Sequence, residues 1–172
     1  MNNIKHIYWF AYFGESSPSV RYRAIFPLAY YYKKDKIGNN VVVPGYSLLK
    51  IIPFLVAYIS ALCFRKRKSI IVIQRVQTNF IYARLLKFLL FVRRKNTIYD
   101  IDDADYINGN AKEIEYFATH CDKISAGSLA LKKHFKTLNP KTAYVTSPII
   151  DLNIYKFNKN KLFTIGWVGG LS

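Results

Sequence analysis

The stretch Thr97-Ile98-Tyr99-Asp100-Ile101 decides the fold class, because it is a short apolar run between two segments of helical period. Those helical segments lie near residues 78–93 and 111–120, and the same alternation recurs along the chain. Further strands are expected at Ile4–Ala11, Asn40–Val43, Ile70–Gln74, Lys123–Ala126 and Thr142–Thr146, and further helices near 18–34, 46–64 and 128–138. Six strands alternating with helices predict an α/β fold with a mostly parallel sheet covered on both faces.

Length and composition favour a folded domain with a sizeable core. The chain has 172 residues, of which 51% are hydrophobic and 16% aromatic, and this composition excludes an intrinsically disordered protein. Its two cysteines, Cys63 and Cys121, lie far apart in apolar runs, which favours two buried thiols in a reducing compartment. Residues 1–5 lead straight into a strand-like run, so we expect no signal peptide and a cytoplasmic location.

The net charge of +16 is unevenly distributed. Residues 1–99 contain 17 of the 26 Lys and Arg residues but only two acidic residues, whereas residues 100–115 contain six of the ten acidic residues. A basic body with one acidic spot indicates an anionic partner and a separate polar site. On charge alone, nucleic acid and anionic lipid are both candidate partners.

Polar segments follow three of the expected strands. They are residues 14–23 after the first strand, Gln74, Arg75 and Gln77 after the third, and Asp100–Asp105 after the fourth. In open α/β sheets, ligands bind outside the carboxyl ends of the strands. We therefore expect all three segments to open on one crevice.

The segment after the first strand has features of an anion-binding loop. Gly14 would allow close backbone approach, and Ser17 or Ser19 would cap the following helix. The helix start, with Arg21 and Arg23, would then offer N–H groups and guanidinium to a phosphate. The alternative is an ordinary helix start followed by surface arginines.

The aspartates at 100, 102, 103 and 105 form the densest titratable cluster. One interpretation is a divalent cation site that holds a diphosphate, since hard cations prefer carboxylate oxygens. A second is direct contact of one carboxylate with sugar hydroxyls, and a third is an acidic loop that caps the next segment. Asp100 and Asp102 share one strand face and Asp103 points elsewhere, so at most two of the carboxylates can converge without a metal. Polar contact with a ligand is favoured over the metal site.

Two apolar segments are each followed by a basic run. Residues 51–64 precede Arg65-Lys66-Arg67-Lys68, and residues 80–92 precede Arg93-Arg94-Lys95. The first contains Pro53 and is shorter than the roughly 20 residues that a membrane span needs. A buried helix is the first interpretation, and a helix lying in the membrane interface with a polybasic edge is the alternative.

The last residues, Phe163-Thr164-Ile165-Gly166-Trp167-Val168-Gly169-Gly170, predict a buried strand that enters a glycine turn. The N–H groups of Gly169 and Gly170 could then approach a phosphate. Polar residues without periodicity precede this strand. We therefore expect a domain at 1–147, a linker at 148–161, and the first strand of a truncated second domain at 162–172.

Taken in order, these motifs resemble the N-terminal half of a GT-B glycosyltransferase of the group 1 retaining class. The matching residues cover essentially the whole chain. They are Ser17-Pro18-Ser19-Val20-Arg21-Tyr22-Arg23, Ile73-Gln74-Arg75, Tyr99-Asp100-Ile101-Asp102-Asp103, Cys121-Asp122-Lys123-Ile124-Ser125-Ala126-Gly127-Ser128-Leu129-Ala130-Leu131, Ser147-Pro148-Ile149-Ile150-Asp151-Leu152-Asn153-Ile154-Tyr155 and Thr164-Ile165-Gly166-Trp167-Val168-Gly169-Gly170. Each motif is weak alone, and the ordered set is more specific.

The resemblance implies one of two Rossmann-like domains that face a cleft, with this domain binding mainly the acceptor. It implies transfer from a nucleotide-sugar to a glycan or lipid-linked acceptor, without a metal or other cofactor. The two apolar segments with their basic runs add the expectation of a peripheral enzyme at the inner face of the membrane. Asp102 or Asp103 stands where many relatives carry a histidine beside the donor sugar, so these two are expected to be catalytic. The expected substrate-binding residues are Gly14, Ser17, Arg21, Arg23, Arg75, Asp100 and Asp105.

Two other classes of function compete with this interpretation. A basic, non-catalytic module that binds nucleic acid or anionic membrane would fit the charge, but no RNA- or DNA-binding motif is present, so no nucleic-acid partner is expected. A phosphoryl-transfer or receiver-like domain would need acidic residues after several strands, whereas here nearly all follow one strand. No metal-ligand spacing joins the three histidines to the cysteines, and there is no P-loop.

Overall fold

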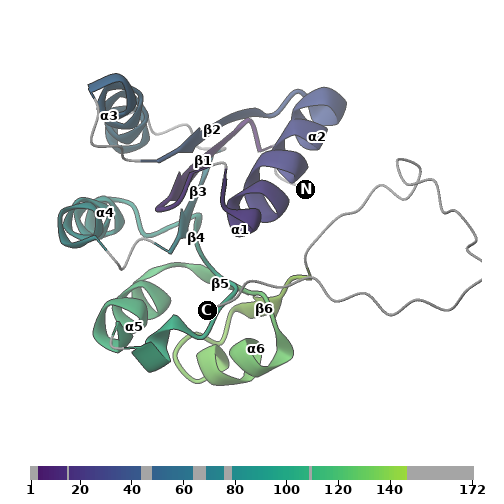
Figure 1. Cartoon of the computed structure of the whole chain (residues 1–172), viewed down its shortest axis with the longest axis vertical. Helices are drawn as coiled ribbons and strands as arrows, with labels where there is room; N and C mark the ends of the chain where they lie inside the picture. The colour runs from purple at the N-terminus through teal and green to yellow at the C-terminus, as the bar shows by residue number, and fades with distance from the viewer. Residues whose placement is uncertain are drawn as a thin grey trace, which may run out of the picture.

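A computed structural model describes residues 4–14, 16–43, 48–63, 69–75, 79–108 and 110–146. These residues form an α/β protein with a Rossmann-like parallel sheet, as the sequence predicts (Figure 1). The strand order is β2-β1-β3-β4-β5-β6, and every neighbouring pair is parallel. The strands are β1 (His6–Ala11), β2 (Gly38–Val42), β3 (Ser69–Gln74), β4 (Thr97–Ile101), β5 (Lys123–Ala126) and β6 (Thr142–Tyr144).

Helices cover both faces of the sheet, but unequally. Within the described ranges, one face carries a single helical segment made of α1 (Pro18–Val20), a π-helical turn η1 (Arg21–Ile25) and α2 (Phe26–Asp35). Figure 1 shows α3, α4 and α5 on the opposite side of the sheet from α1 and α2. The helices that pack into the larger core are α3 (Leu48–Cys63), α4 (Phe80–Val92), α5 (Ala111–His120) and α6 (Leu129–Lys136).

Side chains that alternate along the central strands divide the core in two. Tyr8 and Phe10 of β1 face the larger cluster, with Ile71 and Ile73 of β3. Ala11 faces the smaller cluster under α1 and α2. The strands are therefore apolar on both faces, as a doubly covered parallel sheet requires.

Polar caps fix the start of two helices. Ser128 accepts a hydrogen bond from the N–H of Leu131 at 3.1 Å, which confirms the cap predicted there. Asn79 caps α4 in the same way by accepting from the N–H of Tyr82 at 3.0 Å. Ser17 stands at the cap position of α1 as predicted, but its side chain makes no capping hydrogen bond.

Pro27 accounts for the π-helical turn in the first helical segment. Proline has no N–H, so it cannot donate to the carbonyl of Arg23 four residues earlier. The turn widens here, and the N–H of Phe26 bonds to the carbonyl of Arg21, five residues back. Arg23 and Ala24 are the buried residues of this turn.

Helix α3 is neither fully buried nor purely interfacial. Phe54, Ala57, Tyr58 and Ala61 recur at helical spacing and are buried. The other face is also apolar and lies exposed, with Leu49, Ile52, Leu55, Val56 and Ile59. Within the described ranges, no helix has both the length and the hydrophobicity to cross a bilayer.

The two thiols differ in burial. Cys121 is buried as predicted, whereas Cys63, at the end of α3, is exposed and the prediction for it was wrong.

Several predictions concern residues outside the described ranges. These are the linker 148–161, the strand 162–172 with Gly169 and Gly170, the basic run 65–68, and Gln77.

Candidate functional site

The segments after β1, β3 and β4 meet at the carboxyl edge of the sheet, as the sequence predicts. Three side-chain contacts join them: Arg23 to Asp100, Ser19 to Asp102, and Arg75 to Asp103. The four aspartates are thereby divided between two sets of partners. Asp100 and Asp102 contact the first helical segment, while Asp103 and Asp105 contact the end of β3.

Arg23 and Asp100 form a buried bidentate ion pair. Arg23 Nε donates to Asp100 Oδ2 at 2.8 Å and Nη2 donates to Oδ1 at 2.5 Å, and the two side chains are only 4% and 2% exposed. Nη2 also donates to Ser125 Oγ at 3.0 Å. Burial raises the pKa of Asp100 against the opposing influence of Arg23. Burial also opposes the charge of Arg23, but Asp100 outweighs it and raises the pKa of Arg23.

Asp102 lies just beyond the end of β4 and is half-buried. Its Oδ2 accepts a hydrogen bond from Ser19 Oγ, whereas its buried Oδ1 accepts none from the described part of the chain. Gly127 makes this arrangement sterically possible, because a Cβ there would lie 2.8 Å from the Cα of Asp102. The Gly127 N–H donates to the carbonyl of Ile101 at 2.8 Å, which holds the two segments together.

Arg75 connects the end of β3 with Asp103 and Asp105, which follow β4. It adopts a left-handed backbone conformation with φ of 50°, which is uncommon outside glycine. Its Nη1 lies 2.7 Å from Asp103 Oδ2 and its Nε lies 3.1 Å from Asp105 Oδ2. Partial burial and the nearby charge of Asp102 raise the pKa of Asp103, and Arg75 opposes this rise.

The remaining predicted substrate-binding residues lie along the first loop and helix. Gly14 borders two cavities, and a Cβ there would meet open space. Ser17 is half-buried, and its N–H donates to the carbonyl of Gly14 at 3.0 Å. Arg21 is exposed, with its guanidinium 6.0 Å from the ring centre of Tyr22. Arg21 therefore remains accessible, whereas Arg23 is engaged inside the protein.

Gln74 is a further polar group that the sequence placed at this edge without a role. Its side chain is buried, and its Oε1 accepts a hydrogen bond from Trp9 Nε1 at 2.9 Å. Its Nε2 has no hydrogen-bond partner among the described residues. Ser125 and Gly127, which contact Arg23 and Asp102, carry no local sequence signal for this role beyond the glycine itself.

The carboxylates are spread out rather than clustered around one point. Arg75 lies between Asp103 and Asp105, and Arg23 neutralises Asp100. Across the described ranges, no three His, Cys, Asp or Glu side chains are placed to hold a metal ion together. The arrangement is suited to hydrogen bonds with polar groups of a ligand, because it presents carboxylate oxygens and guanidinium groups side by side.

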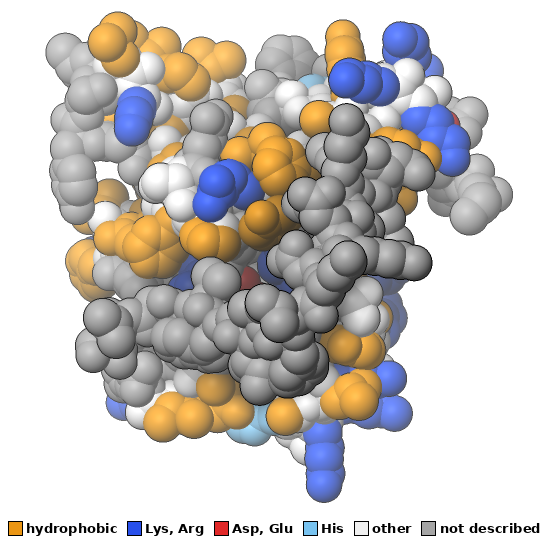
Figure 2. Space-filling view, turned by 45° about the vertical axis from the view of Figure 1, so that its right-hand side comes forward, with side chains coloured by type: hydrophobic (Ala, Val, Ile, Leu, Met, Phe, Trp, Pro, Cys, Tyr) orange, Lys and Arg blue, Asp and Glu red, His pale blue; other side chains and the backbone are white. Residues whose placement is uncertain are grey.

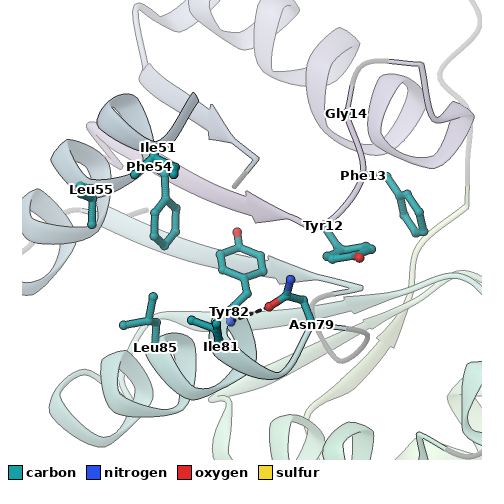
Figure 3. A pocket seen from close by; sticks show the side chains of 10 residues that line it. All are labelled: Tyr12, Phe13, Gly14, Ile51, Phe54, Leu55, Asn79, Ile81, Tyr82 and Leu85. Carbon is teal, nitrogen blue, oxygen red and sulfur yellow. Dashed lines mark hydrogen bonds between the residues drawn. The ribbon is translucent and has the colours of Figure 1, made fainter. Parts of the chain in front are cut away.

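An apolar cavity of about 530 Å³ adjoins this polar crevice (Figure 3). It lies between α3 and α4 and reaches the loop after β1. Phe54 and Tyr82 are its buried floor, and the ring of Tyr82 points toward β1, where its hydroxyl lies 3.5 Å from the carbonyl of Ala11. Its other lining residues are Tyr12, Phe13, Gly14, Ile51, Leu55, Asn79, Ile81 and Leu85.

Comparison with known proteins identifies no relative: no family model, no curated protein and no solved structure matches this chain.

Proposed function

We propose that this chain supplies the acceptor side of a glycosyltransferase, which moves a sugar from a nucleotide-sugar to a glycan or lipid-linked acceptor. In that reaction the bond between the anomeric carbon and the diphosphate oxygen breaks. A new bond forms from the anomeric carbon to an acceptor hydroxyl oxygen, and that hydroxyl loses its proton. The donor half would come from a second domain of the same general type.

The observation that carries the proposal is the state of Asp102. One of its oxygens is bound by Ser19, and the other accepts no hydrogen bond within the described ranges although it is buried. Such an atom is unfavourable until a donor reaches it. A sugar hydroxyl supplies a donor of the right size, and a carboxylate beside the anomeric centre also favours positive charge developing there.

Saccharide binding by the chain tests the proposal directly. Saturation-transfer NMR with a panel of mono- and disaccharides should detect binding that Asp102→Asn weakens about 10- to 100-fold, as expected for one hydrogen bond to a charged group. Asp122→Asn is the matched control, because Asp122 precedes β5 and lies at the opposite edge of the sheet. Equal affinity in wild type and both variants would reject the role of Asp102.

The rate of sugar transfer should also fall when Asp102 is changed. When the chain acts with its donor domain, Asp102→Asn should lower the rate of sugar transfer by on the order of 10² to 10³ without changing the free energy of unfolding. A chelator should have little effect. Loss of transfer on chelation would support the metal-binding interpretation of the aspartates instead.

We also propose peripheral contact with an anionic membrane, which the surface of α3 and α4 supports. Leu49, Ile52, Phe88 and Phe91 are among their exposed side chains, and neither helix contains an acidic residue. Figure 2 shows another part of the surface, where the coloured side chains of the described residues are mainly hydrophobic, Lys and Arg, and acidic ones are hardly visible. Apolar and cationic groups together favour anionic lipid over neutral lipid.

Vesicle co-sedimentation tests this contact. Binding to vesicles with anionic lipid should exceed binding to neutral vesicles and should weaken with salt, because salt screens exposed charges. The double variant Leu49→Ser/Phe91→Ser should reduce it, whereas Tyr32→Ser, which changes an exposed aromatic residue of α2 on the other face, should not. Equal binding to neutral and anionic vesicles would contradict the proposal.

A further inference from the structure

The apolar cavity between α3 and α4 offers an environment for hydrocarbon rather than for sugar. Its floor and walls are aromatic and aliphatic, and its deepest polar groups are engaged. Asn79 Oδ1 accepts from the N–H of Tyr82, and the Tyr82 hydroxyl points to the carbonyl of Ala11. Burial raises the pKa of Tyr82 well above its ordinary value, so this hydroxyl stays neutral. Most apolar ligands bind in pockets of this kind and size.

The two ends of the cavity differ in chemistry. Figure 3 shows Leu55 and Leu85 at one end and Phe13 at the other. Phe13 lies under the guanidinium of Arg75, with 5.2 Å from the ring centre to Cζ, and Arg75 in turn binds Asp103. One end therefore opens toward the exposed apolar surface of α3 and α4, while the other reaches the polar crevice. A ligand that spans both ends must be amphiphilic.

The charge around the cavity specifies the head group. Helices α3 and α4 carry Lys50, Arg84 and Lys87 and no carboxylate. Lys87 is paired with Glu113 at 2.7 Å, which leaves Lys50 and Arg84 as the exposed cations of these helices. Lys50 also lines the neighbouring cavity of about 540 Å³, which shares Gly14 and Phe54 with the first. Lys50, in the lining of this neighbouring cavity, therefore complements a phosphate attached to a hydrocarbon chain.

We propose that this cavity binds the hydrocarbon chain of an acceptor whose head carries a phosphate, with the acceptor sugar or hydroxyl lying toward Asp102 and Arg75. The inference rests on the proposed function and names the class of its acceptor: a lipid phosphate rather than a free glycan. The chain enters from the α3–α4 surface and ends beside Phe13.

Binding of monomeric alkyl phosphates tests the cavity without any transfer reaction. Hexyl, octyl and decyl phosphate, each below its micelle concentration, are titrated by calorimetry into the full chain. Burial of each methylene group contributes enough to tighten binding about fourfold, so each step of two methylene groups should lower the dissociation constant roughly 15-fold. Inorganic phosphate should bind far more weakly than decyl phosphate. A flat chain-length series would overturn the proposal.

Matched charge variants separate the cavity from the rest of the apolar surface. Leu55→Asp/Ile81→Asp places two negative charges on the rim of the cavity, where both side chains are exposed at 43% and 71%. Ile59→Asp/Phe88→Asp makes a comparable change farther along the same two helices, at residues outside the cavity lining and 52% and 56% exposed. We expect the rim pair to weaken decyl phosphate binding at least tenfold and the control pair less than twofold.

Other outcomes have definite meanings. Equal weakening by both pairs would overturn the proposal, because it would show contact with a general apolar surface such as a membrane. All variants change exposed positions, and circular dichroism with thermal unfolding verifies that they fold. Binding of decyl phosphate with no saccharide binding would keep this inference and reject the proposed function. Saccharide binding that is insensitive to an attached hydrocarbon chain would support the proposed function and overturn this inference.

Discussion

Asp100 and Asp102 are two residues apart and face the same side, yet their surroundings give them different roles. Asp100 is bound on both oxygens by Arg23 and is buried. Asp102 is bound on one oxygen by a serine hydroxyl, which is a weaker partner than guanidinium. The first belongs to a structural ion pair, and the second keeps one buried oxygen without a hydrogen-bond partner in the described part of the chain. Arg75 holds Asp103 and Asp105 in place from the other side of the loop.

The two cysteines provide a test at the scale of single residues. Burial raises the pKa of the Cys121 thiol to about 12, so at pH 8 almost none of it is the reactive thiolate. Cys63 is exposed at the end of α3. A disulfide exchange reagent should therefore modify one thiol quickly in the native protein and the second only after unfolding. Cys63→Ser should abolish the fast phase, and fast modification of Cys121 in that variant would contradict the packing described.

At the scale of elements, the π-helical turn sets which side chains of the first helical segment point toward the sheet. Arg21 and Arg23 are two residues apart, so on any helix they point in clearly different directions. The widened turn before Pro27 directs Arg23 toward β4 and leaves Arg21 in solvent. The position of Arg23 beside Asp100 therefore depends in part on a proline four residues farther along the chain.

The starts of β5 and β6 are joined by an ion pair whose contribution depends on pH. The hydrogen bond from Lys141 at 2.7 Å is the main cause that lowers the pKa of Asp122, with burial opposing it. A lowered pKa in the folded protein means that the stabilisation is present above the unfolded pKa of about 4 and is lost as pH falls through the folded value. When the pH is lowered, the Asp122→Asn variant should therefore lose less stability than the wild type.

The expected effect is small, at most about 1 kcal/mol, because the pair is largely exposed. Urea unfolding at pH 7 and pH 3 measures it as the difference between the two free energies of unfolding. Asp35→Asn is the control, since Asp35 at the end of α2 forms no ion pair or hydrogen bond with the described part of the chain. An equal change in both variants would show that general charge, and not this pair, sets the acid sensitivity.

At the scale of the molecule, the Arg23–Asp100 pair joins the first helical segment to the sheet. It ties the helical segment on the thinly covered face to the fourth strand of the sheet, and Ser125 extends the contact to the fifth. Asp100→Asn should lower the free energy of unfolding by about 3 to 5 kcal/mol, because it leaves a buried guanidinium without its counter-charge. Equilibrium unfolding in urea measures the change.

The double variant Arg23→Met/Asp100→Leu is the matching control. Replacing both members of a buried ion pair by apolar groups removes the unpaired charge, so much of the lost stability should return. A double variant no more stable than Asp100→Asn would show that the pair also fixes the geometry of the segment between β1 and β2.

The sequence predicted the sheet better than the site. All six strands were predicted, because buried apolar runs between helical segments are a local signal, although β2 begins at Gly38 rather than Asn40. It placed Arg21 and Arg23 in the same role, because the local sequence does not show which of the two packs against the sheet and which stays in solvent. It gave Ser125 and Gly127 no part in the site, because their contacts with Arg23 and Asp102 join residues about 25 to 100 positions apart.

The position of β1 inside the sheet has a consequence for synthesis of the chain. This strand is made before both of its neighbours, β2 and β3, so one of its edges has no partner until Gln74 has been added. At translation rates of roughly 5 to 20 residues per second, this interval lasts roughly 3 to 13 seconds. Throughout it, an apolar strand containing Tyr8 and Phe10 presents an open edge to other nascent chains. Yield of soluble protein in cells should therefore depend on ribosome speed over residues 12–74.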